Sequence, residues 1–170
     1  MMQPIEFRAP WSKPLRIVTA VTTAILLATS LLILLLSHKG TGLMLLIGVV
    51  PLLLLAIAIP CAVRGYVLTD QAIIVRRVGW RTRLPLSGLQ SVSGDANAMR
   101  GSLRLLGNGG LFSFSGEFWN RRLGRYRALA TDPSRAVVLR YPGRTLVITP
   151  HDPQQFIMRA RTLLSTSQFR

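Results

Sequence analysis

Two long apolar runs near the start of the chain constrain its fold more than any other feature. Residues 17–36 and 43–63 form runs of 20 and 21 residues without Asp, Glu, Lys, Arg or His. As a helix rising about 1.5 Å per residue, each run is long enough to cross the roughly 30 Å hydrocarbon core of a bilayer. Only residues 37–42 separate the runs, so the helices must be antiparallel neighbours. The sequence predicts a two-helix transmembrane hairpin.

Charges flanking this hairpin predict its orientation. Arg8, Lys13 and Arg16 precede the first run, several arginines follow the second, and the connecting segment holds only Lys39. The positive-inside rule places both termini in the cytoplasm and the short connecting segment outside. Neither run carries the charged or His side chains that ion pathways need, so the hairpin is predicted to be an anchor. A cleaved signal peptide is disfavoured because a second span follows at once.

Residues 64–170 form the second predicted unit, a cytoplasmic domain that follows the N-terminal segment and hairpin of residues 1–63. Short β-prone segments alternate with turn signals, which predicts six to eight antiparallel strands. The candidate strands cover residues 66–69, 72–78, 81–86, 89–93, 102–106, 125–130, 136–141 and 144–149. The glycines at 107–110 are expected to interrupt the chain as a bulge rather than a phosphate-binding nest, and residues 117–124 are expected to leave the sheet.

A change of period predicts one helix at the end of the domain. Asp152 has the N-cap role, Pro153 is suited to the first helical position, and Gln155 completes a capping box. Apolar residues then recur at helical spacing and need a partner, which the open end of a curved sheet provides. They are Phe156, Ile157, Ala160, Leu163 and Leu164.

The order of these segments resembles the bacterial membrane-anchored pleckstrin-homology-like (PH-like) domains. The resemblance rests on YVLTDQAIIVRRVGWRTRLPLSGLQSV at 66–92, RLLGNGGLFSFSGEFWNRRLGRYRALATD at 104–132, and the later segments AVVLRY, RTLVITP and DPQQFI. It covers nearly all of residues 66–165. It implies a partly open β-barrel of two near-orthogonal antiparallel sheets, capped at one end by the C-terminal α-helix. It brings no catalytic motif.

Arginine dominates the charge of the chain. The net charge is +15, from 21 Lys+Arg against 6 Asp+Glu, and 19 of the basic residues are Arg. The guanidinium fork binds phosphate through two parallel hydrogen bonds. Because side chains alternate along a strand, Arg81 and Arg83 share one face of their strand, and Arg125 and Arg127 share one face of theirs. The alternative is that these side chains are solvated and bind nothing specific. The candidate residues for binding an anionic headgroup or a partner are Arg76, Arg81, Arg83, Arg125 and Arg127, with Arg77, Arg104, Arg121 and Arg122 as further candidates.

Catalytic and cofactor signals are missing from the sequence. Cys61 is the only cysteine, and there is no metal-ligand spacing, Walker A sequence or nucleophile elbow. We therefore predict no catalytic residues, no metal and no cofactor. The expected function is a non-enzymatic, membrane-tethered module for protein interaction or homo-oligomeric assembly at the inner leaflet. The alternative is recognition of anionic phospholipid headgroups; an enzyme on phosphorylated or lipid substrates is remote, and nucleic acid is a poor fit.

Overall fold

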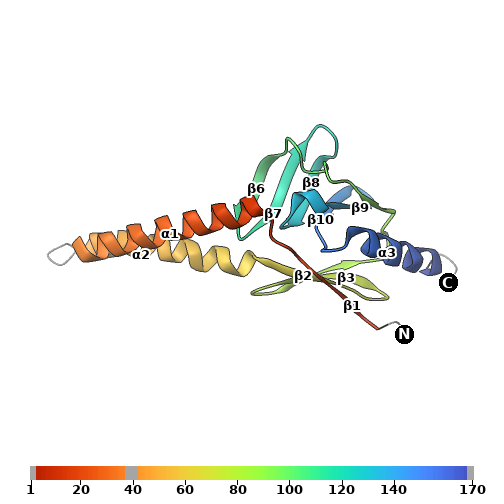
Figure 1. Ribbon diagram of the computed structural model, residues 1–170, viewed down its shortest axis with the longest axis horizontal. Coiled ribbons are helices and arrows are strands. Elements are labelled where there is room, and N and C mark those ends of the chain that lie inside the picture. Colours follow the sequence, from red (N-terminus) through yellow and green to blue (C-terminus); the bar gives the residue numbers. More distant parts are fainter. Residues whose placement is uncertain (1–2, 37–41, 168–170) are drawn as a thin grey trace.

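A computed structural model describes residues 3–36 and 42–167 and shows an elongated molecule. A helical hairpin forms one end, and two sheets with a third helix form the other (Figure 1). Both chain ends lie on the side of the sheets, away from the tip of the hairpin. The predicted turn at residues 37–42 lies almost entirely outside the described residues.

The hairpin consists of α1 (Lys13–Leu36) and α2 (Gly42–Ala58), followed by the 3-10 turn η2 (Ile59–Cys61). Ser30 Oγ donates to the carbonyl of Gly48 at 2.5 Å and links the two helices. The second run was predicted to extend through Val63, and this is wrong at its end. Val63 begins a strand and is fully buried. Pro60 has no N–H to continue the helix, which accounts for the early end.

The first sheet contains four antiparallel strands in the order β1-β2-β3-β4. They are β1 (Ile5–Arg8), β2 (Val63–Leu68), β3 (Ala72–Arg77) and β4 (Arg81–Pro85). The sequence analysis did not predict β1, because its four residues include a single buried side chain, Phe7. By pairing with β2, β1 joins the segment before the hairpin to the domain after it.

The second sheet contains six strands in the order β5-β9-β10-β8-β7-β6. They are β5 (Ser91–Gly94), β6 (Leu103–Leu111), β7 (Ser113–Asn120), β8 (Gly124–Ala130), β9 (Val137–Tyr141) and β10 (Arg144–Ile148). The prediction that all strands are antiparallel is wrong at one place, since β10 runs parallel to β8. In the β9–β10 hairpin, β10 is the strand that pairs with β8. The hydrophobic periodicity of single strands does not predict this strand order.

Of the two predictions about the long β6–β7 hairpin, the one for residues 107–110 is confirmed only in part and the one for residues 117–124 is wrong. The glycines at 107–110 do not interrupt the strand, because β6 continues through them with register shifts at 104–106 and 109–111. Gly107 and Gly110 have φ of 97° and 133°, so the expectation of a bulge with positive φ is confirmed. Residues 117–120 do not leave the sheet but complete β7, and a tight turn at 121–123 leads into β8.

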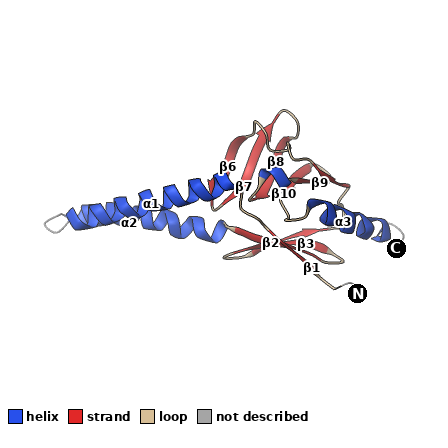
Figure 2. Cartoon of the chain, viewed as in Figure 1, coloured by secondary structure: helices blue, strands red, loops and turns tan. Residues whose placement is uncertain are grey.

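The main core is formed by buried side chains of both sheets and of α3 (Pro153–Ser167). Figure 2 shows α3 next to the strands of the two sheets. Phe156 and Ala160 of α3 are fully buried, and Phe156 meets Phe7 edge-to-face at 5.2 Å. Asp152 Oδ1 accepts from the N–H of Gln155 at 2.9 Å, which confirms the predicted N-cap. The sheets do not close into a full barrel. The predicted class, an apolar helical hairpin plus a partly open PH-like domain capped by a helix, is confirmed.

Candidate functional site

The five predicted arginines lie on two different faces. Cross-strand partners share a face, and Arg76 is opposite Arg81 while Arg83 is opposite Ile74. These side chains alternate with the core residues of β3 and β4, so they point outward from the first sheet. In the second sheet Arg127 pairs with buried Leu146 of β10, which places it on the face toward the first sheet.

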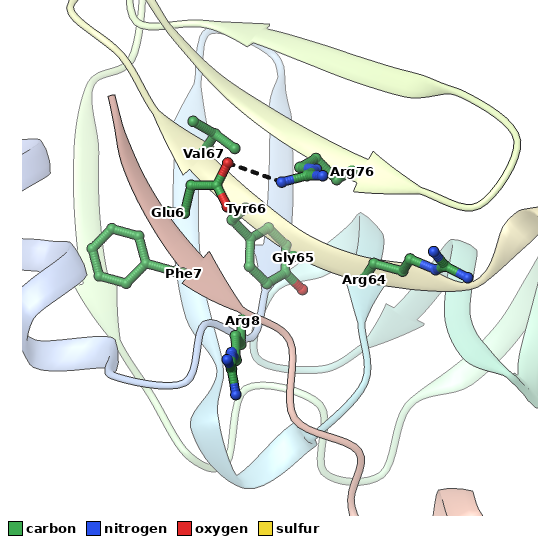
Figure 3. Close-up of a pocket in the computed structure, with 8 residues that line it drawn as sticks. All are labelled: Glu6, Phe7, Arg8, Arg64, Gly65, Tyr66, Val67 and Arg76. Atoms are coloured by element: carbon green, nitrogen blue, oxygen red, sulfur yellow. Dashed lines mark hydrogen bonds and ion pairs between the residues drawn. The ribbon is translucent and has the colours of Figure 1, made fainter. Parts of the chain in front are cut away.

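On the outer face of the first sheet, a pocket of about 210 Å³ surrounds Gly65 (Figure 3). Arg8, Arg64 and Arg76 line it, and Arg76 Nη1 donates to Glu6 Oε1 at 2.9 Å. All three arginines are exposed. The pair with Glu6 neutralises the charge of Arg76, and because both side chains are exposed it contributes only about 0–1 kcal/mol to stability.

Arg125 and Arg127 lie beside a second pocket, of about 410 Å³, together with Arg144 and Glu117. Arg125 Nε donates to Glu117 Oε2 at 2.8 Å, and its Nη2 donates to the same oxygen. The charge of Arg125 is therefore balanced locally. Arg127 shares this pocket and also lines a larger space next to the helices.

That larger space, the fork cleft, opens where α1 and α2 separate as they approach the sheets (Figure 1). Its volume is about 650 Å³. The helices line one side, and β3, β6, β7 and β8 line the other. The lining residues are Thr22, Leu26, Leu54, Ile57, Ala58, Cys61, Arg77, Arg104, Gly107, Asn108, Leu111, Ser115, Gly116 and Arg127.

Arg77 is the most constrained cation of the fork cleft. It follows Ile73 and Val75 on the inner face of β3, so alternation directs it between the sheets. Its guanidinium lies 5.3 Å from the ring centroid of Trp80. Its Nε and Nη2 atoms are buried and have no hydrogen-bond partner in the described part of the chain. Burial, and next the charge of Arg127, lower the pKa of Arg77.

The β6–β7 hairpin forms one wall of the fork cleft and is held against α1. Thr19 Oγ1, which is buried, accepts from the N–H of Phe112 at 3.0 Å and donates to the carbonyl of Gly110 at 3.5 Å. Phe112 has φ of 65°, a conformation that this contact helps to hold. Ser113 Oγ donates to the carbonyl of Cys61 at 3.0 Å, which fixes the hairpin to the end of η2 as well.

Outside the cleft, β6 is the outermost strand of the second sheet and carries apolar side chains. Leu103, Leu105 and Leu106 are 63%, 54% and 71% exposed, and Trp119 of the neighbouring β7 is 41% exposed. An exposed strand edge with apolar side chains is an established site for pairing with another chain. This group of four residues is called the β6 edge below.

Candidate metal ligands are not clustered among residues 3–36 and 42–167. No group of three or more His, Cys, Asp or Glu side chains converges there as a metal site would require. His151 lies just before α3, where its backbone N–H donates to the carbonyl of Arg8 and its ring Nδ1 lies 3.1 Å from Arg135 Nη1.

Sequence reasoning favoured the exposed arginines and ranked Arg77 and Arg104 only as further candidates. The inward position of Arg77 was present in the alternation of β3, since residues 73, 75 and 77 share one face. The position of Arg104 had no comparable signal, because a register shift lies next to it.

Comparison with known proteins gives the same family as the fold. The family model described as "Bacterial PH domain" matches residues 64–164, which begin within β2 and end within α3. No curated protein and no solved structure matches the chain. Because the family match covers more than half of the chain and the two sheets with their capping helix agree with it, the chain belongs to the bacterial PH domain family.

Proposed function

We propose that this protein is a non-enzymatic interaction module tethered to the inner leaflet of a bacterial membrane. Residues 1–63, which include β1, provide the tether, and residues 64–170 provide the PH-like domain, with both termini in the cytoplasm. The observation that carries the proposal is the attachment of the domain to an apolar helical hairpin through Thr19, Ser113 and β1.

The exposed apolar side chains of α1 and α2 support a membrane tether. Both helices are long and apolar enough to cross a bilayer, with mean hydropathy of 2.4 and 2.9. A core helix of a soluble domain would bury such a surface, whereas here Leu36 and Ile57 are 73% and 70% exposed. Contiguous apolar surface of this extent calls for lipid or a partner.

The β6 edge supports an interaction role for the domain. Its unpaired backbone groups offer hydrogen bonds to an added strand, and its leucines offer apolar contact. The expected occupant is another protein chain, including a second copy of this one. A PH-like domain is in general a non-catalytic interaction module, which agrees with this role.

The test for assembly compares two arginine substitutions in the full chain, purified in mild detergent. Leu105→Arg places a charge on the β6 edge, and Met158→Arg is the matched control on α3, where Met158 is 63% exposed. Mass photometry and cross-linking in membranes are expected to show an oligomer or a defined complex that only Leu105→Arg disrupts. A monodisperse monomer without a partner, or equal behaviour of both variants, would contradict the assembly role.

The tether has its own test. Carbonate extraction of membranes is expected to leave the full chain in the pellet, because two spans hold it in the bilayer. Release into the supernatant would overturn the membrane part of the proposal without bearing on assembly.

A further inference from the structure

The fork cleft combines an apolar wall with a cationic base. Leu26 of α1 and Leu54 and Ile57 of α2 belong to the apolar runs predicted to lie in the membrane. Arg77 and Arg127 line the opposite side, where the domain begins. A ligand that fits both sides has an apolar part directed along the helices and an anionic part directed at the arginines.

Among the described residues, the buried N–H groups of Arg77 have no hydrogen-bond acceptor, so an anionic ligand could supply one. A buried N–H group without an acceptor costs about 1–3 kcal/mol, and more when the group is charged. Nε and Nη2 of Arg77 are two such groups. A phosphate offers several oxygen acceptors and the geometry for a two-pronged contact with guanidinium.

The residues that line the fork cleft add positive charge and include no acidic side chain. Arg104 folds over Gly109, whose missing Cβ would lie 2.9 Å from Arg104 Cδ. Arg127 is close enough to Arg77 for its charge to lower the pKa of Arg77. Among the described residues that line the cleft, none is acidic, and the nearby Glu117 forms its ion pair with Arg125 instead.

We propose that the fork cleft binds one anionic phospholipid, with its phosphate against Arg77, Arg104 and Arg127 and its acyl chains along α1 and α2. This inference rests on the membrane tether proposed above. A lipid is favoured over a free phosphate because the apolar wall continues into the exposed surface of both helices, whose side chains face the bilayer in a tethered chain.

The experiment measures lipid binding by the full chain, delipidated in detergent, with native mass spectrometry. The probes are phosphatidylglycerol, phosphatidylcholine and inorganic phosphate. One phosphatidylglycerol is expected to bind per chain, at least about tenfold more tightly than phosphatidylcholine, and inorganic phosphate is not expected to displace it.

Two substitution pairs localise the site. Arg77→Gln with Arg127→Gln is expected to weaken phosphatidylglycerol binding at least about tenfold, since charge-assisted hydrogen bonds are lost. The control, Arg81→Gln with Arg83→Gln, removes the same charge from the opposite face of the first sheet and is expected to change binding less than about twofold. Arg104→Gln alone is the second variant, because Arg104 is exposed and its loss leaves the core intact.

Three outcomes would overturn the lipid site. The first is equal binding of phosphatidylglycerol and phosphatidylcholine. The second is an equal loss of phosphatidylglycerol binding in the cleft pair and the control pair, together with no effect of Arg104→Gln. The third is displacement of the lipid by inorganic phosphate, which would indicate a small-anion site. A chain that stays in carbonate-washed membranes yet shows one of these outcomes loses the lipid site and keeps the tether.

Discussion

Tyr66 is the residue that ties the two sheets together. Its side chain is fully buried, and its hydroxyl donates to the carbonyl of Leu129 at 2.6 Å. The same hydroxyl accepts from the N–H of Thr149 at 3.1 Å. Tyr66→Phe is expected to lower the free energy of unfolding by about 1–3 kcal/mol, because both backbone groups lose their partner. Thermal unfolding in detergent measures the loss, and an unchanged transition would contradict it.

The same hydroxyl predicts a pH dependence. Burial raises the pKa of Tyr66 from 10.0 to about 12. As the pH rises, the unfolded chain therefore loses the Tyr66 hydroxyl proton before the folded chain does. The stabilisation that this hydroxyl gives the folded state is intact below pH 10 and is lost between pH 10 and 12. The expected total is about 2–3 kcal/mol. Between pH 10 and 12, the free energy of unfolding should fall less steeply with pH in Tyr66→Phe than in the wild type. Parallel curves for the two proteins would contradict the raised pKa of Tyr66.

A pair of glycines makes a second residue-scale prediction. Gly107 and Gly116 face each other across β6 and β7 with φ of 97° and 149°, and a Cβ on Gly116 would overlap the carbonyl of Leu106. Gly116→Ala is expected to destabilise the hairpin by about 1–3 kcal/mol. Gly42→Ala is the control, because a Cβ there meets nothing. Melting temperatures of the two variants in detergent provide the comparison, and equal values would argue against a required glycine pair.

At the scale of elements, contact between α1 and the β6–β7 hairpin sets one wall of the fork cleft. Thr19→Val keeps the shape of the side chain but leaves the N–H of Phe112 without its acceptor. We expect faster amide hydrogen exchange at residues 110–113 and a free energy of unfolding that is lower by about 1–3 kcal/mol. Thr29→Val, an exposed position of the same helix, is the control. Unchanged exchange at Phe112 would show that the wall is held in another way.

The elements themselves were largely predictable, and their pairing was not. Alternation gave β4, since Arg81 and Arg83 are exposed while Leu84 is buried, and the capping signal at Asp152 gave the start of α3. Pairing depends on contacts distant in sequence. β1 forms only because β2 passes beside it, and the parallel β8–β10 pair depends on where the β9–β10 hairpin docks.

The same limit applied to the candidate site. Arg77 and Arg127 are 50 positions apart, and only the facing of the two sheets places them beside one cleft. Charge and alternation identified arginine as the relevant residue type. They could not show that Arg76 would be ion-paired to Glu6, because that partner comes from the unpredicted strand β1.

At the scale of the whole molecule, the proposed tether predicts one orientation in the membrane. If the domain and both termini are cytoplasmic, α3 must be shielded from reagents added outside the cell, and the segment joining α1 to α2 must be reachable. The chain has one cysteine, Cys61, so Cys61→Ser gives a background free of thiols. Ser165→Cys places a thiol at an exposed position of α3, and Lys39→Cys places one in the connecting segment.

We expect a membrane-impermeant maleimide added to intact cells, after the outer membrane is made permeable, to label Lys39→Cys and not Ser165→Cys. Disrupting the inner membrane should expose Ser165→Cys to the reagent, which controls for its reactivity. The reverse pattern would place the arginines of the fork cleft at the outer leaflet. Because the positive-inside bias opposes that arrangement, flanking charge and labelling would then disagree, and the proposed cytoplasmic role would be wrong whatever the lipid measurements show.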